Sequence, residues 1–505
     1  MRRRLLPSPS SPERTALPGH RSFRSLRGVA LTALLLAPAA QADFTALKRL
    51  QAEGAQVTAS VYDLDNRSLV QTLNPAQRLA PASVTKLALA AAALDAWPAD
   101  KAFQTRLLGA GAIQDGTLAG DLVLQSDGDA TLDQPSLWLL VAQLRGAGIN
   151  AVGGRLLVNP SYGPLACDNL DRCQALERSD TAYNVPLAGI GIDYGTWCTQ
   201  IIAGVVGSEA QLRGCGTSRL PLPADGAIRT VAASGKNRVW VERVTVDGRD
   251  RLRVGGTIPA GTEQRVFRAM SSPAQGTGET LRQMLVEAGI RIGETVSIVY
   301  GPLPTSSRVL AQTEGLALRE QLGRMLRYSN NYIADLLTLN LGAARLPQPP
   351  TQLGDAAKAL AAFVASTREP ASKGAPATAP ALFSGSGLTP ENELSADDLI
   401  GLLAHQYRDT RNFPAFYGAL VVPRQAPFNF VRQGNDDWLD RVTLKTGTMN
   451  VPRSVCGIAG YLRKKNGGWM AFAVIVNGGP TRLQIPLQQA MDAARHDIQD
   501  VLARY

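Results

Sequence analysis

Short strand-like segments fill the middle of the chain, from about residue 105 to residue 271, and longer helical patterns lie on both sides of them. Glycine-rich turns separate these segments, and one helical pattern, Ser136–Gly146, interrupts them. A chain of 505 residues, of which 45% are hydrophobic, can form more than one folding unit. We therefore expect a mainly β region, residues 106–271, made of one or two small modules and inserted into an α/β domain formed by residues 43–105 together with 272–505.

The segments that flank this region mix strands with helices. Two strands, Gln56–Leu64 and Ser68–Leu73, precede an alanine- and leucine-rich helix that begins near Ser83 and ends before Pro98. Residues 367–382 are rich in proline and alanine and predict a surface loop. The elements expected after residue 271 are the helices Gly278–Gly289, Ala317–Tyr328, Asn331–Leu341 and Asp355–Ser366, the strands Ser454–Arg463 and Trp469–Asn477, and a closing helix from about Leu483 to Ala503.

The first 42 residues have the pattern of an export signal. Arg21, Arg24 and Arg27 lie just before the apolar run Val29–Leu36, and Ala40-Gln41-Ala42 fits a cleavage site. The apolar run is too short to cross a bilayer as a mature helix, although an uncleaved anchor or a buried helix is an alternative. We therefore expect cleavage near Ala42, a periplasmic location and no stable membrane span after cleavage.

Removal of this segment leaves little net charge. The whole chain has 52 basic and 42 acidic residues. The first 42 residues contain seven arginines and one glutamate, so the remainder has 45 basic and 41 acidic residues, a surplus of four. No stretch interleaves basic and aromatic residues as a strand-binding groove would. A nucleic-acid partner is therefore not expected.

Four of the five cysteines lie within 49 residues: Cys167, Cys173, Cys198 and Cys215. In an oxidising compartment the simplest of the three possible pairings is Cys167–Cys173 with Cys198–Cys215. A zinc site is the alternative, but this segment contains neither CxxC nor histidine. The fifth, Cys456, lies in an apolar stretch and is predicted to be a buried free thiol. We expect neither a metal nor a cofactor.

The residue types narrow the possible hydrolase chemistry. Beyond the export signal only His405 and His496 remain, each on a predicted helix and neither beside a Gly-x-Ser-x-Gly turn, so a Ser-His-Asp mechanism is not expected. A serine activated by a lysine is the remaining possibility. Ser83 and Lys86 are three residues apart at the start of a predicted helix, so the amine can reach the hydroxyl. The alternative is an ordinary N-cap serine beside a solvated lysine.

Two more short motifs contain residues suited to this chemistry. Ser329-Asn330-Asn331 lies at the junction of two predicted helices, although it could also cap the second helix. Lys445-Thr446-Gly447 follows the strand-like Arg441–Leu444 and precedes Thr448. Each of the patterns Ser-x-x-Lys, Ser-x-Asn and Lys-Thr-Gly occurs once in the chain, and their order is the one expected of penicillin-interactive serine enzymes.

With these motifs the chain resembles the penicillin-binding protein and serine β-lactamase superfamily. Within it, the chain resembles the class C low-molecular-mass D-alanyl-D-alanine carboxypeptidase/endopeptidase family, because the 243 residues from Lys86 to Ser329 match that family's large insertion. The resemblance implies a transpeptidase-like domain: an antiparallel sheet flanked by helices, with a helical subdomain and the mainly β insertion. Further similar segments are Gly128–Leu132, Tyr328–Asp335 and Ser384–Thr389, with Ala130 in place of a proline and Ser384 in place of an acid.

The resemblance also implies a catalytic role for five motif residues. Ser83 would be the acylated nucleophile and Lys86 the base that deprotonates it. Ser329 would relay a proton to the leaving group, and Asn331 would hold Lys86 and the substrate amide. Lys445 would contribute a positive electrostatic field.

The substrate-binding residues implied by the resemblance are Thr446, Gly447 and Thr448. The two threonines would bind the terminal carboxylate of the substrate, and the backbone N–H groups of Ser83 and Thr448 would form an oxyanion hole. The strand Lys445–Thr448 should be an edge strand, so that the substrate peptide or a β-lactam can dock by strand addition.

The function implied is that of a serine-type D-Ala-D-Ala carboxypeptidase/endopeptidase. It would act on peptidoglycan pentapeptides or cross-linked muropeptides through an acyl-enzyme on Ser83, and β-lactams would inhibit it. One alternative is a β-lactamase or esterase on the same fold, which would turn over penicillin rapidly. Another is a non-catalytic cell-wall-binding protein, in which intact Ser83, Lys86 and Lys445 would be unexpected.

Overall fold

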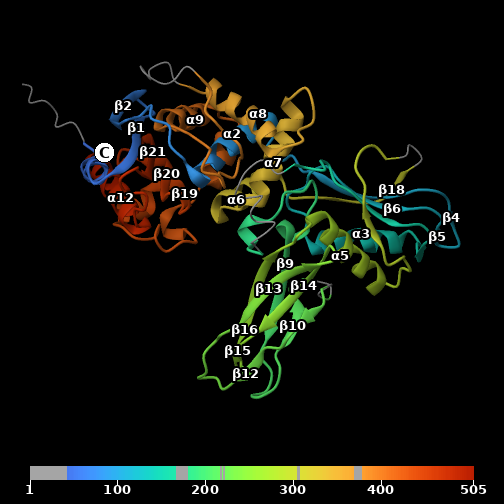
Figure 1. The fold of residues 1–505 in the computed structure, drawn as a ribbon. Coiled ribbons are helices and arrows are strands. Elements are labelled where there is room, and N and C mark those ends of the chain that lie inside the picture. The colour runs from blue at the N-terminus through green and yellow to red at the C-terminus, as the bar shows by residue number, and fades with distance from the viewer. Residues whose placement is uncertain (1–42, 167–179, 217–218, 220–221, 304–306, 369–377) are drawn as a thin grey trace, which may run out of the picture. The chain divides into compact units, whose positions relative to one another are not determined.

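The structure is a computed structural model that describes residues 43–166, 180–216, 219, 222–303, 307–368 and 378–505 (Figure 1). The expected export signal, the pair Cys167–Cys173 and most of the expected loop 367–382 lie outside these residues. Within the described part of the chain, no helix combines the length and the apolar character that a membrane span requires.

A five-stranded antiparallel sheet joins the two ends of the chain. Its strand order is β19-β20-β21-β1-β2. The strands are β1 (Ala55–Asp63), β2 (Ser68–Leu73), β19 (Val442–Met449), β20 (Val455–Arg463) and β21 (Trp469–Gly478). Figure 1 shows the blue β1 beside the red β21, and the two strands pair from Ala55 opposite Gly478 to Asp63 opposite Met470. The predicted hairpin at the start of the chain therefore extends the C-terminal sheet, and β19 lies at its edge.

Helices cover both faces of this sheet because the side chains of each strand alternate between two cores. In β21, Ala473 and Ile475 belong to one core, whereas Phe472 and Val474 belong to the other. The first core includes α9 (Ala396–Arg408), and the second includes α1 (Thr45–Ala52) and α12 (Leu487–Arg504). This arrangement confirms the expected antiparallel sheet flanked by helices.

The helix α2 (Thr85–Ala96) lies in the middle of the first core. Every residue from Thr85 to Leu94 is buried, since this alanine- and leucine-rich segment has no polar face. Other helices contact it on several sides: α6 (Leu318–Tyr328), α7 (Asn331–Arg345), α8 (Leu353–Ser366), α9 and the short α10 (Phe413–Ala419). A further short helix, α11 (Asp436–Arg441), leads into β19.

A second five-stranded sheet has the order β17-β8-β6-β3-β18. Its strands are β3 (Gln104–Gly109), β6 (Leu122–Ser126), β8 (Leu156–Asn159), β17 (Val296–Ile298) and β18 (Arg308–Glu314). The helices α3 (Gln134–Gly146) and α5 (Pro273–Glu287) share a hydrophobic core with it. The strands β17 and β18 lie beyond residue 271, the expected end of the mainly β region, and pair with β8 and β3. The sequence pattern did not predict the place of β18 in this sheet, because that place depends on its distant partner β3.

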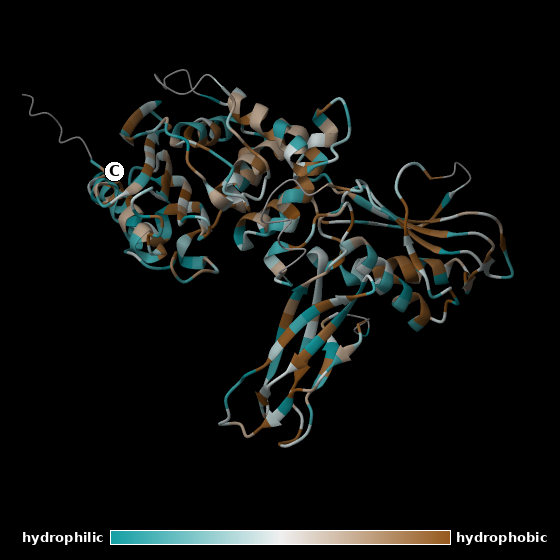
Figure 2. Ribbon diagram, in the orientation of Figure 1, coloured by the Kyte–Doolittle hydropathy of each residue, from teal (hydrophilic) through white to brown (hydrophobic). Residues whose placement is uncertain are grey.

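The strands from β9 to β16, between residues 196 and 269, form a small β module, whereas β4, β5 and β7 form a separate three-stranded sheet. One antiparallel sheet contains β9 (Thr196–Ile202), β10 (Gln211–Gly214) and β16 (Glu263–Ala269), and another contains the hairpin of β13 (Trp240–Val246) and β14 (Arg249–Gly255). Figure 2 shows hydrophilic and hydrophobic residues interspersed along these strands. A disulfide joins Cys198 to Cys215, which confirms that predicted pair. The shortest strands are β4 (Ile113–Gln114), β5 (Thr117–Leu118), β7 (Ala151–Val152), β11 (Ala224–Asp225), β12 (Arg229–Val231) and β15 (Thr257–Pro259).

Candidate active site

The first motif lies at the start of the buried helix α2. A turn of 3₁₀ helix, Ala82–Val84, precedes α2 and places Ser83 and Lys86 on the same side. Lys86 Nζ lies 2.9 Å from Ser83 Oγ. The Lys86 side chain is fully buried and Ser83 is partly buried. The lysine is therefore held beside the serine hydroxyl and away from solvent.

The Lys445-Thr446-Gly447 motif packs directly against the segment that contains Ser83. A Cβ atom on Gly447 of β19 would lie only 2.4 Å from the carbonyl oxygen of Pro81 and 2.9 Å from the backbone nitrogen of Ser83. Only glycine allows the strand to come this close to the serine. Ala82 adopts a left-handed conformation with φ of 46°, which is uncommon for a residue with a Cβ atom. The strand and the helix start thus meet at Ser83.

The second motif forms the turn between α6 and α7. Ser329 has φ of 55° and ψ of 37°, so it leaves the helical conformation immediately after α6. The N-cap of α7 is Asn330, whose side chain accepts a hydrogen bond from the Ile333 N–H at 2.9 Å. The Ser329 hydroxyl is therefore not the cap of this helix, and it accepts a hydrogen bond from Lys445 Nζ at 3.0 Å.

Asn331 connects Lys86 to the segment that contains Tyr183. Its Oδ1 accepts a hydrogen bond from Lys86 Nζ at 2.8 Å, and its Nδ2 donates to the carbonyl of Tyr183 at 2.9 Å. These two bonds determine the orientation of the carboxamide, because the oxygen must face the amine and the nitrogen must face the carbonyl. The Tyr183 side chain itself is exposed.

Lys445 is a buried amine without an anionic partner among the described residues. Its side chain is 1% exposed, and Nζ donates to Ser329 Oγ and to the carbonyl of Thr446, the latter at 2.6 Å. Burial lowers the pKa of Lys445 from 10.5 to about 7. A carboxylate that entered the site would favour the protonated form. The neighbouring Thr446 is buried and Thr448 is exposed at the end of β19.

The structure thus brings the eight residues of the three motifs to one place. Ser83, Lys86 and Asn331 form one hydrogen-bonded group, Ser329 and Lys445 form a second, and Gly447 brings β19 against Ser83. The expectation of an edge strand for the third motif is confirmed.

Two backbone carbonyls at this site escaped the sequence analysis, those of Tyr183 and Ser386. The Ser386 carbonyl accepts a hydrogen bond from Lys86 Nζ at 2.6 Å. A backbone carbonyl can be supplied by any residue type, so no sequence motif could reveal these two residues. The only available indication was the similarity of the segment Ser384–Thr389 to a family segment.

Cys456 lies on β20 opposite Thr448 and is a buried free thiol, as predicted. Burial raises the pKa of this thiol to about 12. A thiol that stays protonated at neutral pH is a poor nucleophile. Cys456 therefore packs beneath the strand and adds no second nucleophile to the site.

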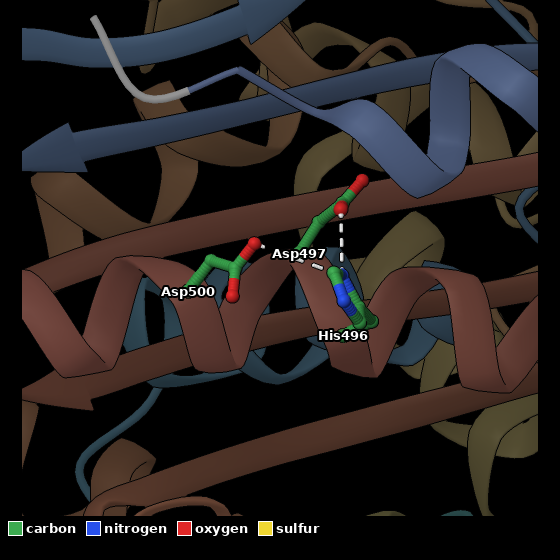
Figure 3. Close-up of side chains that lie close together, drawn as sticks. All are labelled: His496, Asp497 and Asp500. Carbon is green, nitrogen blue, oxygen red and sulfur yellow. Dashed lines mark hydrogen bonds and ion pairs between the residues drawn. The ribbon is translucent and has the colours of Figure 1, made fainter. Parts of the chain in front are cut away.

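One group of described side chains elsewhere has the composition of a metal site. It consists of His496, Asp497 and Asp500 on α12 (Figure 3). The Asp497 carboxylate is fully buried and accepts hydrogen bonds from the backbone N–H groups of Ala46 at 3.0 Å and Leu47 at 2.9 Å. Both belong to the first turn of α1, where backbone N–H groups have no partner within the helix. Asp497 therefore links α12 to the start of α1, and this link accounts for its burial.

Comparison with known proteins identified a family and several relatives. The family model described as D-Ala-D-Ala carboxypeptidase 3 (S13) family matches residues 40–498. A D-alanyl-D-alanine carboxypeptidase of Actinomadura sp. (strain R39) is 25% identical over 451 residues, which are 86% of this chain and 80% of that protein. D-alanyl-D-alanine carboxypeptidase DacB of Haemophilus influenzae is 24% identical over 450 residues, which are 85% of this chain and 87% of that protein.

Solved structures share the fold. The crystal structure of penicillin binding protein 4 (dacB) from Haemophilus influenzae matches with a TM-score of 0.70 and 19% identity, and the match covers 90% of this chain and 99% of that one. A structure of the same protein complexed with a novel β-lactam matches with a TM-score of 0.67 and covers 91% and 99% of the two chains. The expected penicillin-binding fold is therefore confirmed.

Proposed function

The chain belongs to the D-Ala-D-Ala carboxypeptidase 3 (S13) family, and on this basis we propose that Ser83 is the nucleophile of a serine-type D-Ala-D-Ala carboxypeptidase/endopeptidase. The observation that carries the proposal is the 2.9 Å distance between Lys86 Nζ and Ser83 Oγ in a buried environment. A general base must lie within hydrogen-bonding reach of the proton that it removes. Lys86 meets this condition.

Acylation follows from this arrangement. The unprotonated Lys86 amine accepts the Ser83 proton while the hydroxyl oxygen attacks the carbonyl carbon of the penultimate D-alanine. The tetrahedral intermediate collapses, its C–N bond breaks, and the proton that Lys86 took from Ser83 passes through the Ser329 hydroxyl to the leaving amine of the terminal D-alanine. Water then hydrolyses the ester on Ser83 and releases the shortened peptide. With a β-lactam, the amide bond of the ring opens in place of the peptide bond.

Lys445 and the threonines of β19 would recognise the terminal carboxylate of the substrate. Lys445 is a buried amine whose pKa of about 7 leaves it partly protonated near neutral pH. A substrate carboxylate would stabilise the protonated form, and the hydroxyls of Thr446 and Thr448 would donate hydrogen bonds to it. The carboxylate of a β-lactam would occupy the same place.

The proposed activity also indicates the substrate and the compartment. Peptidoglycan pentapeptides end in D-alanyl-D-alanine, and in cross-linked muropeptides the same D-alanyl carbonyl is joined to a neighbouring peptide, so we assign both as substrates in the periplasm. The export pattern of the first 42 residues supports this compartment. The disulfide Cys198–Cys215 also suits an oxidising environment.

The test uses the purified mature chain, a pentapeptide that ends in D-Ala-D-Ala, and a labelled penicillin. We expect release of D-alanine and a persistent penicillin adduct that peptide mass spectrometry locates on Ser83. Rapid release of hydrolysed penicillin without D-alanine would favour a β-lactamase. The absence of both D-alanine release and labelling would favour a non-catalytic wall-binding protein.

A further inference from the structure

The loop that contains Ser386 lies beside the base and supplies it with a fixed acceptor. Lys86 Nζ lies 2.6 Å from the Ser386 carbonyl oxygen, 2.8 Å from Asn331 Oδ1 and 2.9 Å from Ser83 Oγ. An unprotonated amine has two N–H groups and one lone pair. Asn331 Oδ1 and the Ser386 carbonyl oxygen can only accept in these contacts, so each of them accepts one N–H of the amine. The lone pair is then directed at the Ser83 hydroxyl, which is the orientation that proton removal requires.

The backbone of Ser386 is itself held by a buried carboxyl group. The Ser386 N–H donates to Asp335 Oδ1 at 3.0 Å, and both residues are 0% exposed. Asp335 lies on α7 four residues after Asn331, so the two side chains project from the same face of the helix, one turn apart. A single helix therefore positions two acceptors of the base: Asn331 Oδ1 directly, and the Ser386 carbonyl through the bond of Asp335 to the Ser386 N–H.

Two glycines hold the loop close to its surroundings. A Cβ atom on Gly385 would lie 2.0 Å from Thr338 Oγ1 of α7, and one on Gly387 would lie 1.9 Å from the carbonyl oxygen of Ala82. Gly387 also has φ of 71°, a conformation that residues with a Cβ atom rarely adopt. The loop thus packs closely against α7 at Gly385 and against Ala82, just before Ser83, at Gly387.

We infer that Asp335 is a positioning residue for acylation, which acts through the backbone of Ser386 to aim the lone pair of Lys86 at Ser83. The inference rests on the proposed roles of Ser83 and Lys86 and adds a residue that does not touch the substrate. Without the Asp335 side chain the Ser386 N–H loses its buried acceptor, and the backbone at Ser386, which also carries the carbonyl of the following peptide bond, can shift. The Ser386 carbonyl then no longer holds the Lys86 amine in place, and the amine samples orientations that are unproductive for proton removal.

The test compares Asp335→Ala, Asp335→Asn and a matched control, Asn340→Ala. Asparagine keeps a carbonyl oxygen that can accept from Ser386, whereas alanine does not. Asn340 is another buried polar residue of α7, and it donates to the carbonyl of Gly128 at 2.9 Å, away from the Ser386 loop. The measurements are the rate of acylation by a fluorescent penicillin, kcat and KM for D-alanine release, and the thermal midpoint of each variant.

We expect Asp335→Ala to lower the maximal acylation rate and kcat by about 100-fold with little change in KM, because small misplacements of a reacting group have effects of this size. Asp335→Asn should recover most of this loss. Asn340→Ala should lose thermal stability but keep its rate per folded molecule. Wild-type rates in Asp335→Ala, or an Asp335→Asn variant as slow as Asp335→Ala, would overturn the inference.

A second measurement follows the environment of the Lys86 amine in the absence of substrate turnover. The side-chain nitrogen of Lys86 can be followed by NMR in protein with ¹⁵N-labelled lysine, and we expect its titration midpoint to be lower in Asp335→Ala than in Asp335→Asn. The comparison between these variants isolates the acceptor, because both lack the negative charge. An identical midpoint in the two variants would refute the positioning role. Wild-type protein that neither releases D-alanine nor binds penicillin would instead refute the proposed function.

Discussion

Lys445 Nζ donates a hydrogen bond to Ser329 Oγ at 3.0 Å, although 116 residues separate the two in the chain. Lys445 reaches this point from the edge strand β19, and Ser329 reaches it from the turn between two helices. Lysine and serine are both residue types that mostly lie on protein surfaces. Together they form a polar pair in which Lys445 is buried and Ser329 is partly buried, and Lys445 has no anionic partner among the described residues. Several measurable consequences follow.

The first prediction concerns the nucleophile. Ser83→Ala should abolish the penicillin adduct and lower D-alanine release by at least ~10⁴-fold, because loss of a nucleophile removes the covalent route. Ser366→Ala is the control, since Ser366 is exposed at the end of α8. The adduct can be measured by intact-protein mass spectrometry. An unaltered rate of D-alanine release in Ser83→Ala would refute the assignment.

The second prediction concerns pH and substrate binding. Because burial lowers the pKa of Lys445 to about 7, the free enzyme loses this positive charge as the pH rises through that value. KM for a peptide with a free terminal carboxylate should therefore rise above pH 7, by up to about tenfold per pH unit. A peptide with an amidated terminus serves as the comparison and should lack this rise. An equal pH dependence of KM for both peptides would contradict the role of Lys445.

The third prediction concerns the stability cost of the same amine. The pKa of Lys445 is about 7 in the folded protein and near its ordinary 10.5 in the unfolded chain, so the unfolded chain binds the extra proton between these values. The destabilisation that the buried charge causes is therefore fully present below pH 7, and it disappears as the pH approaches 10.5. Lys445→Met should raise the free energy of unfolding by ~1–4 kcal/mol at pH 6.

Urea denaturation of wild type and Lys445→Met at pH 6 and pH 10 measures this change, and the increase in unfolding free energy should be smaller at pH 10. The same variant should lose most of its activity, so that stability and activity change in opposite directions. A Lys445→Met protein that is less stable than wild type at pH 6 would show that the buried amine stabilises the fold.

The fourth prediction concerns the contact between β19 and the start of α2. Gly447→Ala places a methyl group 2.4 Å from the Pro81 carbonyl oxygen, so the strand or the serine must move. We expect acylation to fall by about 100-fold and stability to fall by ~1–3 kcal/mol. Gly323→Ala on α6 is the matched control, because its Cβ would meet no atom within 4 Å and should stabilise the helix slightly. Equal effects of the two substitutions on acylation would be inconsistent with the close approach.

The fifth prediction concerns the disulfide of the β module. Cys198 and Cys215 are 17 residues apart, so the chain-entropy effect of the cross-link is worth about 3 kcal/mol. Replacing both cysteines by serine should lower the unfolding free energy by roughly that amount. Penicillin acylation of Ser83 should keep its rate at 25 °C, since neither cysteine belongs to the candidate site. A comparable loss of acylation in the folded variant would show that the module influences catalysis.

Local patterns identified most elements of this chain. The alanine- and leucine-rich segment after Ser83 formed a buried helix, and the predicted hairpin Gln56–Leu73 formed β1 and β2. The pair Cys198–Cys215 was predictable because a short separation favours pairing. The proximity of Ser83 and Lys86 was predictable because helical geometry alone places residues three apart on one side.

Other features depend on pairing between distant segments. The place of β18 in the second sheet could not be predicted locally, because it depends on pairing with β3, about 200 residues earlier. The carbonyls of Ser386 and Tyr183 were equally hidden, since every residue has a carbonyl and only the fold decides which ones reach Lys86 and Asn331.

The sequence by itself determined the reactive groups, because chemistry depends on residue type and the spacing within a helix is constant. The tertiary structure alone decided the environment of those groups: which amine is buried without a counter-charge, which backbone oxygens face it, and where a glycine must admit a strand. These properties arise from packing between segments that are far apart in the chain, and no local pattern of residues encodes them.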